Sequence, residues 1–580
     1  MNHLCARRAK LLFYALAAFA AFLVWRLFDV QVLDGPKLAA LARLRHSTIV
    51  DVPARRGTIY DRNGTPLVDW VPADGIFADT LLVHDKLAVA RRLAPYLDFP
   101  AARIVQALDV PATHRPLERK VPRSVAERIA AMDMPGIRIE PTQTGARRIL
   151  DGKLAATVIG ITGIDDQGLE GLEYSLDSVL RGTPGQLSIL SDEFNRPLPF
   201  SRPQVIAAAR PGDSVELTID AYLQFTTERI LQQTVAKWHA RDGTAIVMDP
   251  NTGGVLAMAN VPNFDPRHFE RYPEKDRRDR AITDAYEPGS TFKLITAAAA
   301  LESGLVTTRT LFPNRDQIRV GDRIIHNAED GFMAGRGMET LGDIIAYSHN
   351  VGAAEVGLRI GRRRLFDTIR DFGFGRPTDI ELPGESPGIL LPLGQWSQSS
   401  LPTIAFGQGI AVTPLSMARA YCAIANGGWL LRPRILSAII GDDGRPIYRY
   451  GTEIDRRVLS PHIAAILRSY LRGVVVRGTG NPSGKVAGYT TAGKTGTAQI
   501  AQNGHYISGG YVASFIGMIP VTHPRYVILV KVDRPQGSIY GSAVAAPAFA
   551  QIARAAMLHD GILPSGASLV ERVRPANRAI

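Results

Sequence analysis

The sequence is nearly free of cysteine. Cys5 and Cys422 are its only two cysteines in 580 residues, so neither a disulfide framework nor a cysteine-based metal cluster can be built. The histidines are scattered, with no H-x-x-x-H or H-E-x-x-H arrangement, and there is no Walker loop and no G-x-G-x-x-G after a strand. We therefore expect no metal and no cofactor. A basic and aromatic cluster is also missing, which argues against a nucleic-acid partner.

Acidic residues are fewer than basic ones. The formal net charge is +12, carried mostly by arginine along the whole chain. Such an excess suits an anionic membrane surface or an anionic substrate, and it equally suits an arginine-rich background on solvated faces. An apolar fraction of 46% in 580 residues predicts sizeable cores in two or three domains.

One long apolar run lies near the N-terminus. Residues 11–25 carry no charge, and Lys10 and Arg26 flank them. These 15 residues fall short of the roughly 20 that span a bilayer, but both flanking side chains can snorkel to the interfaces. A cleaved signal peptide is the alternative, with Ala18-Phe19-Ala20 as its cleavage site. Because that site lies inside the run rather than after it, an uncleaved anchor over residues 11–30 is the better interpretation.

The stretch Glu287 to Lys293 reads EPGSTFK and precedes an almost wholly apolar segment, residues 294–301. The segment predicts a buried helix. If Ser290 opens that helix, Lys293 lies three residues on and on the same face, where its amine can activate the hydroxyl as a nucleophile. The alternative for S-x-x-K alone is a helix-capping serine followed by a snorkelling lysine.

Two further polar clusters follow. Ser348-His349-Asn350 separates two helical stretches, the first with Thr340 and Asp343 as a capping box, and Asn350 could simply cap the second helix. Lys494-Thr495-Gly496-Thr497 follows Ala492-Gly493 and should begin a strand, in which a glycine marks close approach by a ligand or another backbone. An exposed basic turn without a task is the alternative for this cluster.

The region around these clusters predicts an α/β domain with a partly antiparallel sheet. Residues 214–219 alternate like a strand, and Asp220 is a candidate cap for the helix after them. Residues 243–249 and 254–259 form a predicted hairpin, and residues 511–519 and 526–532 two more strands. Residues 55–64 contain an Asn-Gly turn signal and predict a charged hairpin.

The motifs S-x-x-K, S-x-N and K-T-G each occur once, in this order along the chain, beginning at Ser290, Ser348 and Lys494. In that order they resemble the penicillin-recognising serine acyl-transferases. Over nearly its full length the chain resembles the class B penicillin-binding proteins, and in particular the division-specific FtsI type. Residues 56–64 and 168–173 are similar to N-terminal motifs of that family, and no glycosyltransferase domain precedes the linker. His349 stands where many relatives carry serine.

The resemblance implies a multidomain α+β and α/β fold. Its parts would be an N-terminal transmembrane helix, a mixed non-catalytic pedestal domain, and a transpeptidase domain with a mostly antiparallel sheet flanked by helices. The expected boundaries are a cytoplasmic tail at 1–10, the anchor at 11–30, the pedestal or dimerisation-type domain at 45–205, a linker at 206–213, the transpeptidase domain at 214–558 and a C-terminal tail at 559–580.

The resemblance also implies the roles of the site residues. Ser290 would attack D-Ala-D-Ala in a peptidoglycan stem peptide and Lys293 would accept its proton, as a lysine kept neutral by burial and by the charge of Lys494. Ser348 would relay the proton, and Asn350 would hold the peptide amide. Thr495, Gly496 and Thr497 would form, with Lys494, the binding edge for the terminal carboxylate or for a β-lactam.

Expected partners are stem peptides, β-lactam antibiotics, the membrane, a SEDS glycosyltransferase of the FtsW type and other division proteins. The expected location is the inner membrane at the septum, with a single pass, a cytoplasmic N-terminus and a periplasmic catalytic domain. Alternatives are an elongation-specific relative, a serine β-lactamase, or a non-catalytic scaffold or antibiotic sensor.

Overall fold

The computed structural model describes residues 2–38, 47–190, 204–321, 323–327, 337–502 and 505–564. Its tertiary contacts divide the chain into two compact units. The first comprises Met1–Arg55 and Gly182–Pro211, and the second comprises Arg56–Arg181 and Gly212–Ile580. These contact-based units do not test the domain boundaries expected from the sequence, so those boundaries stay predictions.

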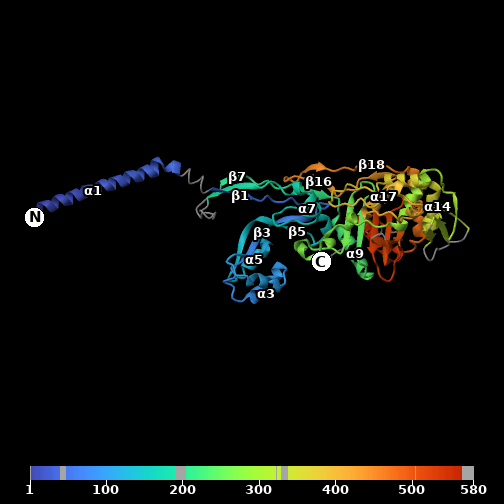
Figure 1. The fold of residues 1–580 in the computed structure, drawn as a ribbon, viewed down its shortest axis with the longest axis horizontal. Helices are drawn as coiled ribbons and strands as arrows, with labels where there is room; N and C mark the ends of the chain where they lie inside the picture. Colours follow the sequence, from blue (N-terminus) through green and yellow to red (C-terminus); the bar gives the residue numbers. More distant parts are fainter. Residues whose placement is uncertain are drawn as a thin grey trace, which may run out of the picture. The chain divides into compact units, whose positions relative to one another are not determined.

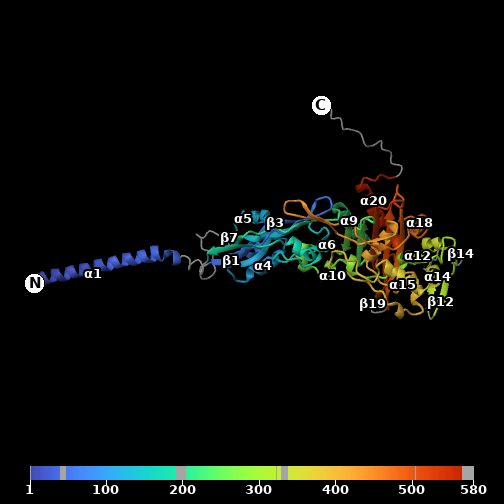
Figure 2. The same ribbon diagram turned by 90° about the horizontal axis from the view of Figure 1, so that it is seen from above.

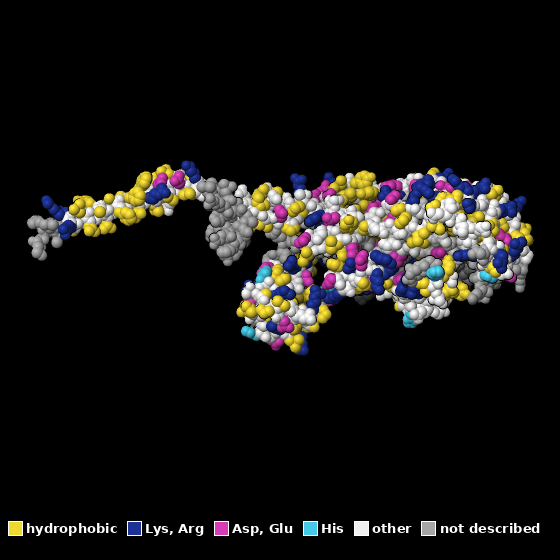
Figure 3. Space-filling view, viewed as in Figure 1, with side chains coloured by type: hydrophobic (Ala, Val, Ile, Leu, Met, Phe, Trp, Pro, Cys, Tyr) yellow, Lys and Arg dark blue, Asp and Glu magenta, His cyan; other side chains and the backbone are white. Residues whose placement is uncertain are grey.

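The first unit contains the apolar N-terminal helix. Helix α1 spans Asn2–Phe28 and continues as a π-helical turn, η1, at Asp29–Leu33. The apolar part, Ala6–Leu33, is long enough to cross a membrane and none of its most apolar window is buried. Figure 3 shows hydrophobic side chains covering this helix, with basic side chains toward both ends. This agrees with the predicted anchor and extends it by a few residues on each side.

A small antiparallel sheet completes the first unit. Its strands are β1 (Ser47–Val52), β6 (Gly185–Leu190) and β7 (Gln204–Ala207), in the order β1-β6-β7. Strand β7 includes the first two residues of the expected linker at 206–213, because it pairs with β6 through residues 204–207. The segment before it, residues 191–203, contains Pro197, Pro199 and Pro203 and lies outside the described residues.

The second unit is built around a five-stranded antiparallel sheet of order β10-β9-β21-β20-β19. The first three strands in this order are β10 (Val255–Val261), β9 (Asp242–Met248) and β21 (Tyr526–Asp533), followed by β20 (His505–Ile519) and the edge strand β19 (Ala492–Gln502). The predicted hairpin and both predicted C-terminal strands are thereby confirmed. K-T-G does not begin its strand, however, since β19 already pairs with β20 at Ala492.

Helices cover both faces of this sheet (Figures 1 and 2). On one face α9 (Ala221–Lys237) and α20 (Ala546–His559) bury Val247, Ile528 and Phe549 in one core. On the other face α12 (Lys293–Glu302) and α17 (Pro414–Ala425) share the larger core with Ile246. Asp220 caps α9 by accepting a hydrogen bond from the Leu223 amide, as predicted. Strands β9 and β21 are therefore buried along their whole length.

Further helices of this unit also contribute to the larger core. They include α13 (Leu341–Tyr347), α14 (Asn350–Ile360), α15 (Arg362–Asp371), α16 (Ser400–Ala405) and α18 (Pro461–Arg477). The capping box of Thr340 and Asp343 at the start of α13 is confirmed. Short strands β14 (Met338–Thr340) and β11 (Leu311–Pro313) pair just ahead of α13.

A second, seven-stranded sheet in the same unit has the order β17-β16-β8-β2-β3-β4, with β5 paired to β3. Its strands are β2 (Ile59–Tyr60), β3 (Pro66–Ala78), β4 (Arg115–Pro122), β5 (Ile137–Ile149), β8 (Ser214–Leu217), β16 (Leu436–Ile440) and β17 (Pro446–Arg449). Strands β2 and β3 form the predicted hairpin, with Gly64 at φ 81° in its turn. Because β2 pairs in parallel with β8, this sheet joins segments on both sides of the expected linker.

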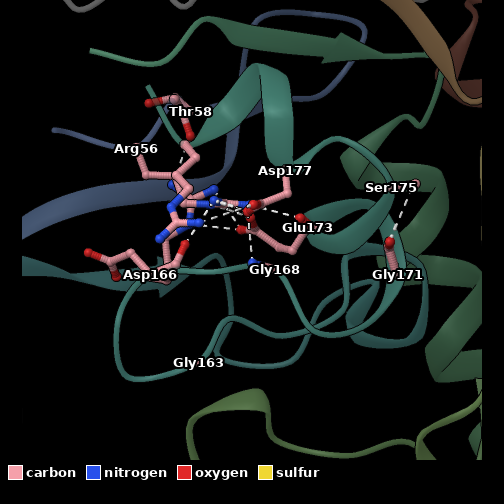
Figure 4. Close-up of polar contacts among 12 residues, drawn as sticks. Arg56, Thr58, Gly163, Asp166, Gly168, Gly171, Glu173, Ser175 and Asp177 are labelled. Atoms are coloured by element: carbon pink, nitrogen blue, oxygen red, sulfur yellow. Dashed lines mark hydrogen bonds and ion pairs between the residues drawn. The ribbon is translucent and has the colours of Figure 1, made fainter. Parts of the chain in front are cut away.

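The two N-terminal sequence motifs meet in a buried charge cluster (Figure 4). The Arg56 side chain is fully buried; its Nε donates to Glu173 Oε2 at 2.6 Å and its Nη1 to Asp177 Oδ1 at 2.6 Å. Its Nη2 donates to the Glu173 carbonyl at 2.8 Å, and Arg147 donates to Glu173 Oε1 at 2.8 Å. The 55–64 segment is thus more than a charged surface hairpin, since its arginine is locked into the core of the fold.

Candidate active site

Ser290 lies on a short 3-10 turn, η3 (Gly289–Phe292), that leads directly into α12. Its side chain is half-buried, whereas the next two residues of the turn, Thr291 and Phe292, are buried. Gly289 has φ 52°, a left-handed value that favours glycine, and its amide donates to the Gly407 carbonyl at 2.9 Å. Ser290 therefore lies on the turn that opens the helix, whereas α12 itself begins at Lys293, and the serine remains reachable from solvent.

Lys293 is almost fully buried at the first residue of α12. Its amine donates to the Ser348 carbonyl at 2.5 Å, to Asn350 Oδ1 at 2.8 Å and to Ser348 Oγ at 3.3 Å. The described residues include no hydrogen bond between Lys293 and Ser290. The snorkelling alternative is wrong, because the amine points inward to the S-x-N motif rather than to water.

The S-x-N motif connects α13 to α14. Ser348 is the C-cap of α13 in a left-handed conformation, φ 65°, ψ 35°. His349 is the N-cap of α14, and Asn350 is its first helical residue. The alternative in which Asn350 caps this helix is therefore wrong, since its side-chain amide instead contacts Lys293 and donates to the His326 carbonyl at 3.2 Å.

The K-T-G motif lies on the edge strand β19 next to this cluster. Lys494 is fully buried, and its amine donates to Ser348 Oγ at 2.8 Å and to the Thr495 carbonyl at 3.2 Å. Thr495 shares a hydrogen bond with Thr479 at 2.7 Å between their hydroxyl oxygens. The exposed-turn alternative for this motif is wrong. Ser348 Oγ consequently lies between the two lysine amines.

Gly496 permits a close approach between β19 and the Ser290 turn. A Cβ at this position would overlap Ser514 Oγ and lie 3.0 Å from Thr291 Cγ2 and 3.3 Å from the Pro288 carbonyl oxygen. Thr497 follows, half-buried, and its hydroxyl accepts a hydrogen bond from the Gly541 amide at 3.4 Å. The close approach predicted for this glycine is confirmed, with the serine turn as the approaching segment.

The two buried lysines are held toward neutrality. Burial is the main cause that lowers the pKa of Lys293 far below its ordinary value; the charge of Lys494 adds to it, and Glu339 acts in the opposite direction. Burial alone lowers the pKa of Lys494 to about 7. A neutral Lys293 can accept a proton, as a base beside a serine must.

Two supporting contacts were not predicted from the sequence. His349 Nδ1 and Glu339 Oε2 lie 2.6 Å apart, and both side chains are buried. Tyr421 on α17 donates to the Thr291 carbonyl at 2.8 Å. The only signal for the first contact was the unusual histidine inside S-x-N, and a lone tyrosine in an apolar helix gave none for the second.

Comparison with known proteins shows the family. Residues 243–554 match the penicillin binding protein transpeptidase domain, and residues 51–217 match the penicillin-binding protein dimerisation domain. The first match covers more than half of the chain and contains all eight predicted site residues, Ser290, Lys293, Ser348, Asn350, Lys494, Thr495, Gly496 and Thr497.

Relatives match over nearly the whole length. Stage V sporulation protein D of Bacillus subtilis is 34% identical over 96% of this chain and 86% of its own length. Peptidoglycan D,D-transpeptidase FtsI of Escherichia coli is 33% identical over 92% of this chain and 88% of its own length. The crystal structure of penicillin binding protein 3 from Mycobacterium tuberculosis matches with a TM-score of 0.68 at 31% identity, covering 89% of this chain and 98% of that one. The chain therefore belongs to the class B penicillin-binding proteins, in which a dimerisation domain precedes the transpeptidase domain.

Proposed function

We propose that this protein is a peptidoglycan D,D-transpeptidase that works through an acyl-enzyme on Ser290. The observation that carries the proposal is the position of Ser348 Oγ between two buried lysine amines, 3.3 Å from Lys293 and 2.8 Å from Lys494. Lys293, one of these two lysines, lies three residues after Ser290, which solvent can reach. A relative that matches 92% of this chain is named a peptidoglycan D,D-transpeptidase, and a structural relative was solved in complex with aztreonam.

The first step is acylation. Ser290 Oγ attacks the carbonyl of the penultimate D-alanine while neutral Lys293 takes the hydroxyl proton. Ser348, hydrogen-bonded to both lysines, passes a proton to the departing amine, and terminal D-alanine leaves. The backbone N–H groups of Ser290 and Thr497 stabilise the oxyanion, for which the free side of edge strand β19 is suited.

The second step transfers the acyl group. An amine from a neighbouring stem peptide attacks the ester, a peptide cross-link forms, and Ser290 Oγ recovers its proton. During the first step, before terminal D-alanine leaves, Lys494, Thr495 and Thr497 hold its carboxylate, and Asn350 holds the amide of the same peptide. A β-lactam mimics the D-Ala-D-Ala end, so it acylates Ser290 and leaves slowly.

Cross-linking by purified protein tests this proposal. The full chain in detergent, given glycan strands with pentapeptide stems, should release D-alanine and form cross-linked dimers. Ser290→Ala should lose both products. Ser303→Ala, at the other end of α12 and bonded only to local groups, should retain them. Dimer formation by Ser290→Ala would contradict the proposal.

Two further measurements, one on the purified protein and one in cells, distinguish the alternatives. A β-lactamase would hydrolyse penicillin at many turnovers per second, whereas a transpeptidase should stay acylated. A scaffold or antibiotic sensor would leave septal cross-linking in cells intact when Ser290 is replaced by alanine. The dimerisation domain and the apolar helix favour the transpeptidase over a β-lactamase.

We place the enzyme at the division septum of the inner membrane, with α1 as a single-pass anchor. Basic residues Arg7, Arg8 and Lys10 favour a cytoplasmic N-terminus and a periplasmic catalytic domain. An FtsW-type glycosyltransferase and other division proteins are the proposed partners. Depletion should produce filaments. Round cells would instead indicate an elongation role, and a defect confined to sporulation would indicate the role suggested by the sporulation relative.

A further inference from the structure

A hollow of about 280 Å³ lies in the same unit as Ser290, and none of the eight site residues lines it. It is bounded by the C-terminal end of α15, the loop at residues 373–379, helix α17 and strand β18 (Ile454–Arg457). All of these segments belong to the described part of the chain. A volume of this size suits a compact chemical group.

The walls of this hollow are rich in arginine. Five arginines and three carboxylates line it, an excess of two positive charges: Arg370, Arg376, Arg419, Arg432 and Arg456, with Asp379, Glu453 and Asp455. Two of the carboxylates are already paired. Glu453 lies 3.1 Å from Arg432, and Asp455 lies 2.8 Å from Arg419 and 3.3 Å from Arg456.

Two of the arginines have no carboxylate partner among the described residues. Arg370 is at the end of α15, and Arg376 is on the loop that follows; both are exposed. Neither forms an ion pair or a side-chain hydrogen bond within the described ranges. Their guanidinium groups are therefore available to a ligand in the hollow.

Arg419 supplies a buried donor. Its side chain is only 6% exposed. Nε donates to the Leu431 carbonyl at 2.7 Å and Nη2 to Asp455 Oδ2 at 2.8 Å. Nη1 lies beside Gly373, another residue of the wall, and has no hydrogen-bond partner among the described residues. This nitrogen can therefore donate to an acceptor placed in the hollow.

We infer that this hollow binds a compact phosphate-bearing anion, held by Arg370, Arg376 and Arg419. Guanidinium groups form charge-assisted, bidentate hydrogen bonds with phosphate oxygens. Three of them on separate elements suit a tetrahedral group, which accepts donors from several directions, better than a planar carboxylate. The inference does not depend on acyl transfer at Ser290.

Binding of pyrophosphate to the full chain in detergent tests the inference. Calorimetry at constant ionic strength should show saturable, one-to-one binding. The double variant Arg370→Gln/Arg376→Gln should weaken it at least tenfold. Arg362→Gln, which removes an exposed arginine from the same helix but outside the hollow, should leave it unchanged. Both variants should retain labelling by a fluorescent penicillin, which shows that they are folded.

A second arm identifies the source of the phosphate. Glycerophosphodiester competes with pyrophosphate if the natural ligand is a phosphate within a polymer, and fails to compete if it is a free or terminal phosphate. Either result supports an anion site. No saturable pyrophosphate binding, or equal binding by the wild type and the double variant, would overturn the inference.

Discussion

At the residue scale, the site depends on two lysines that burial makes unusual. Lys293 and Lys494 are both almost fully buried, and a buried amine loses the hydration that favours its charged form. For Lys293, burial is the main cause, and the charge of the neighbouring Lys494 further disfavours its charged form. Lys293 can therefore act as a neutral base, whereas Lys494 titrates near neutral pH.

The rate of acylation should depend on pH in a bell shape. The low-pH limb reflects loss of neutral Lys293 as it gains a proton, and it should lie well below pH 10.5, the ordinary lysine value. The high-pH limb reflects Lys494, which is charged below a pKa of about 7 and neutral above it. The second-order rate constant for a carboxylate-bearing penicillin, measured across pH, reports these values for the free enzyme.

Lys494→Arg provides the control for this profile. An arginine stays charged across the accessible pH range, so the high-pH limb should disappear even if the maximum rate falls. A profile of unchanged shape in this variant would show that Lys494 is not the group responsible for that limb.

His349 is expected to position the S-x-N turn. Replacing it with serine removes the contact to Glu339 and leaves a buried carboxylate without this partner. We expect His349→Ser to lower the unfolding free energy by about 1–3 kcal/mol and to slow acylation by displacing Ser348. Thermal unfolding and penicillin acylation measure the two effects.

A double variant tests whether His349 and Glu339 stabilise the fold as a pair. His349→Ser/Glu339→Gln removes the buried charge as well, so it should recover part of the lost stability, as expected for coupled neighbours. Purely additive losses would mean that the two side chains do not act as a pair.

At the element scale, activity depends on how closely β19 packs against the Ser290 turn. Gly496 is the point of contact, because any side chain there would meet Ser514 on the next strand and Thr291 on the turn. Gly496→Ala should therefore push strand β19 away from Ser290 and reduce the acylation rate by at least tenfold. Stopped-flow measurement of penicillin acylation tests this prediction.

Gly394→Ala is the matched control, since a Cβ at Gly394 would meet no atom within 4 Å and its φ is not left-handed. It should acylate at the wild-type rate. If Gly496→Ala acylates as fast as Gly394→Ala, the close approach is not required for catalysis.

Elements with local signals could be predicted from the sequence. Asp220 and the pair of Thr340 and Asp343 mark helix starts through hydrogen bonds to amides only a few residues away. The Asn63-Gly64 turn marks the β2–β3 hairpin in the same way. The three motifs around Ser290, Ser348 and Lys494 could be assembled because each has a recognisable spacing and their order is informative.

Long-range partners could not be predicted. Strand β2 has two residues, too few for a periodic pattern, and its parallel partner β8 lies more than 150 residues away. Arg56 showed no sign in the sequence that its partners would be Glu173 and Asp177. The inward direction of Lys293 toward Asn350 depends in the same way on tertiary packing rather than on helix spacing.

At the scale of the whole molecule, the account requires the catalytic unit outside the cytoplasm. Protease added to intact spheroplasts should digest the protein down to a short N-terminal fragment that contains α1 and resists extraction with carbonate. The physical reason is the basic flank before the apolar helix, which disfavours translocation of that end. Full protection of the chain until the membrane is lysed would contradict this orientation.

The central claim is that Ser290 is the nucleophile of a class B transpeptidase. The most direct test labels the full chain with a fluorescent penicillin, digests it, and identifies the modified residue by mass spectrometry. The account predicts one penicilloyl group per chain, on Ser290, and no label on Ser290→Ala. Label on any other residue, including Ser348, would contradict it.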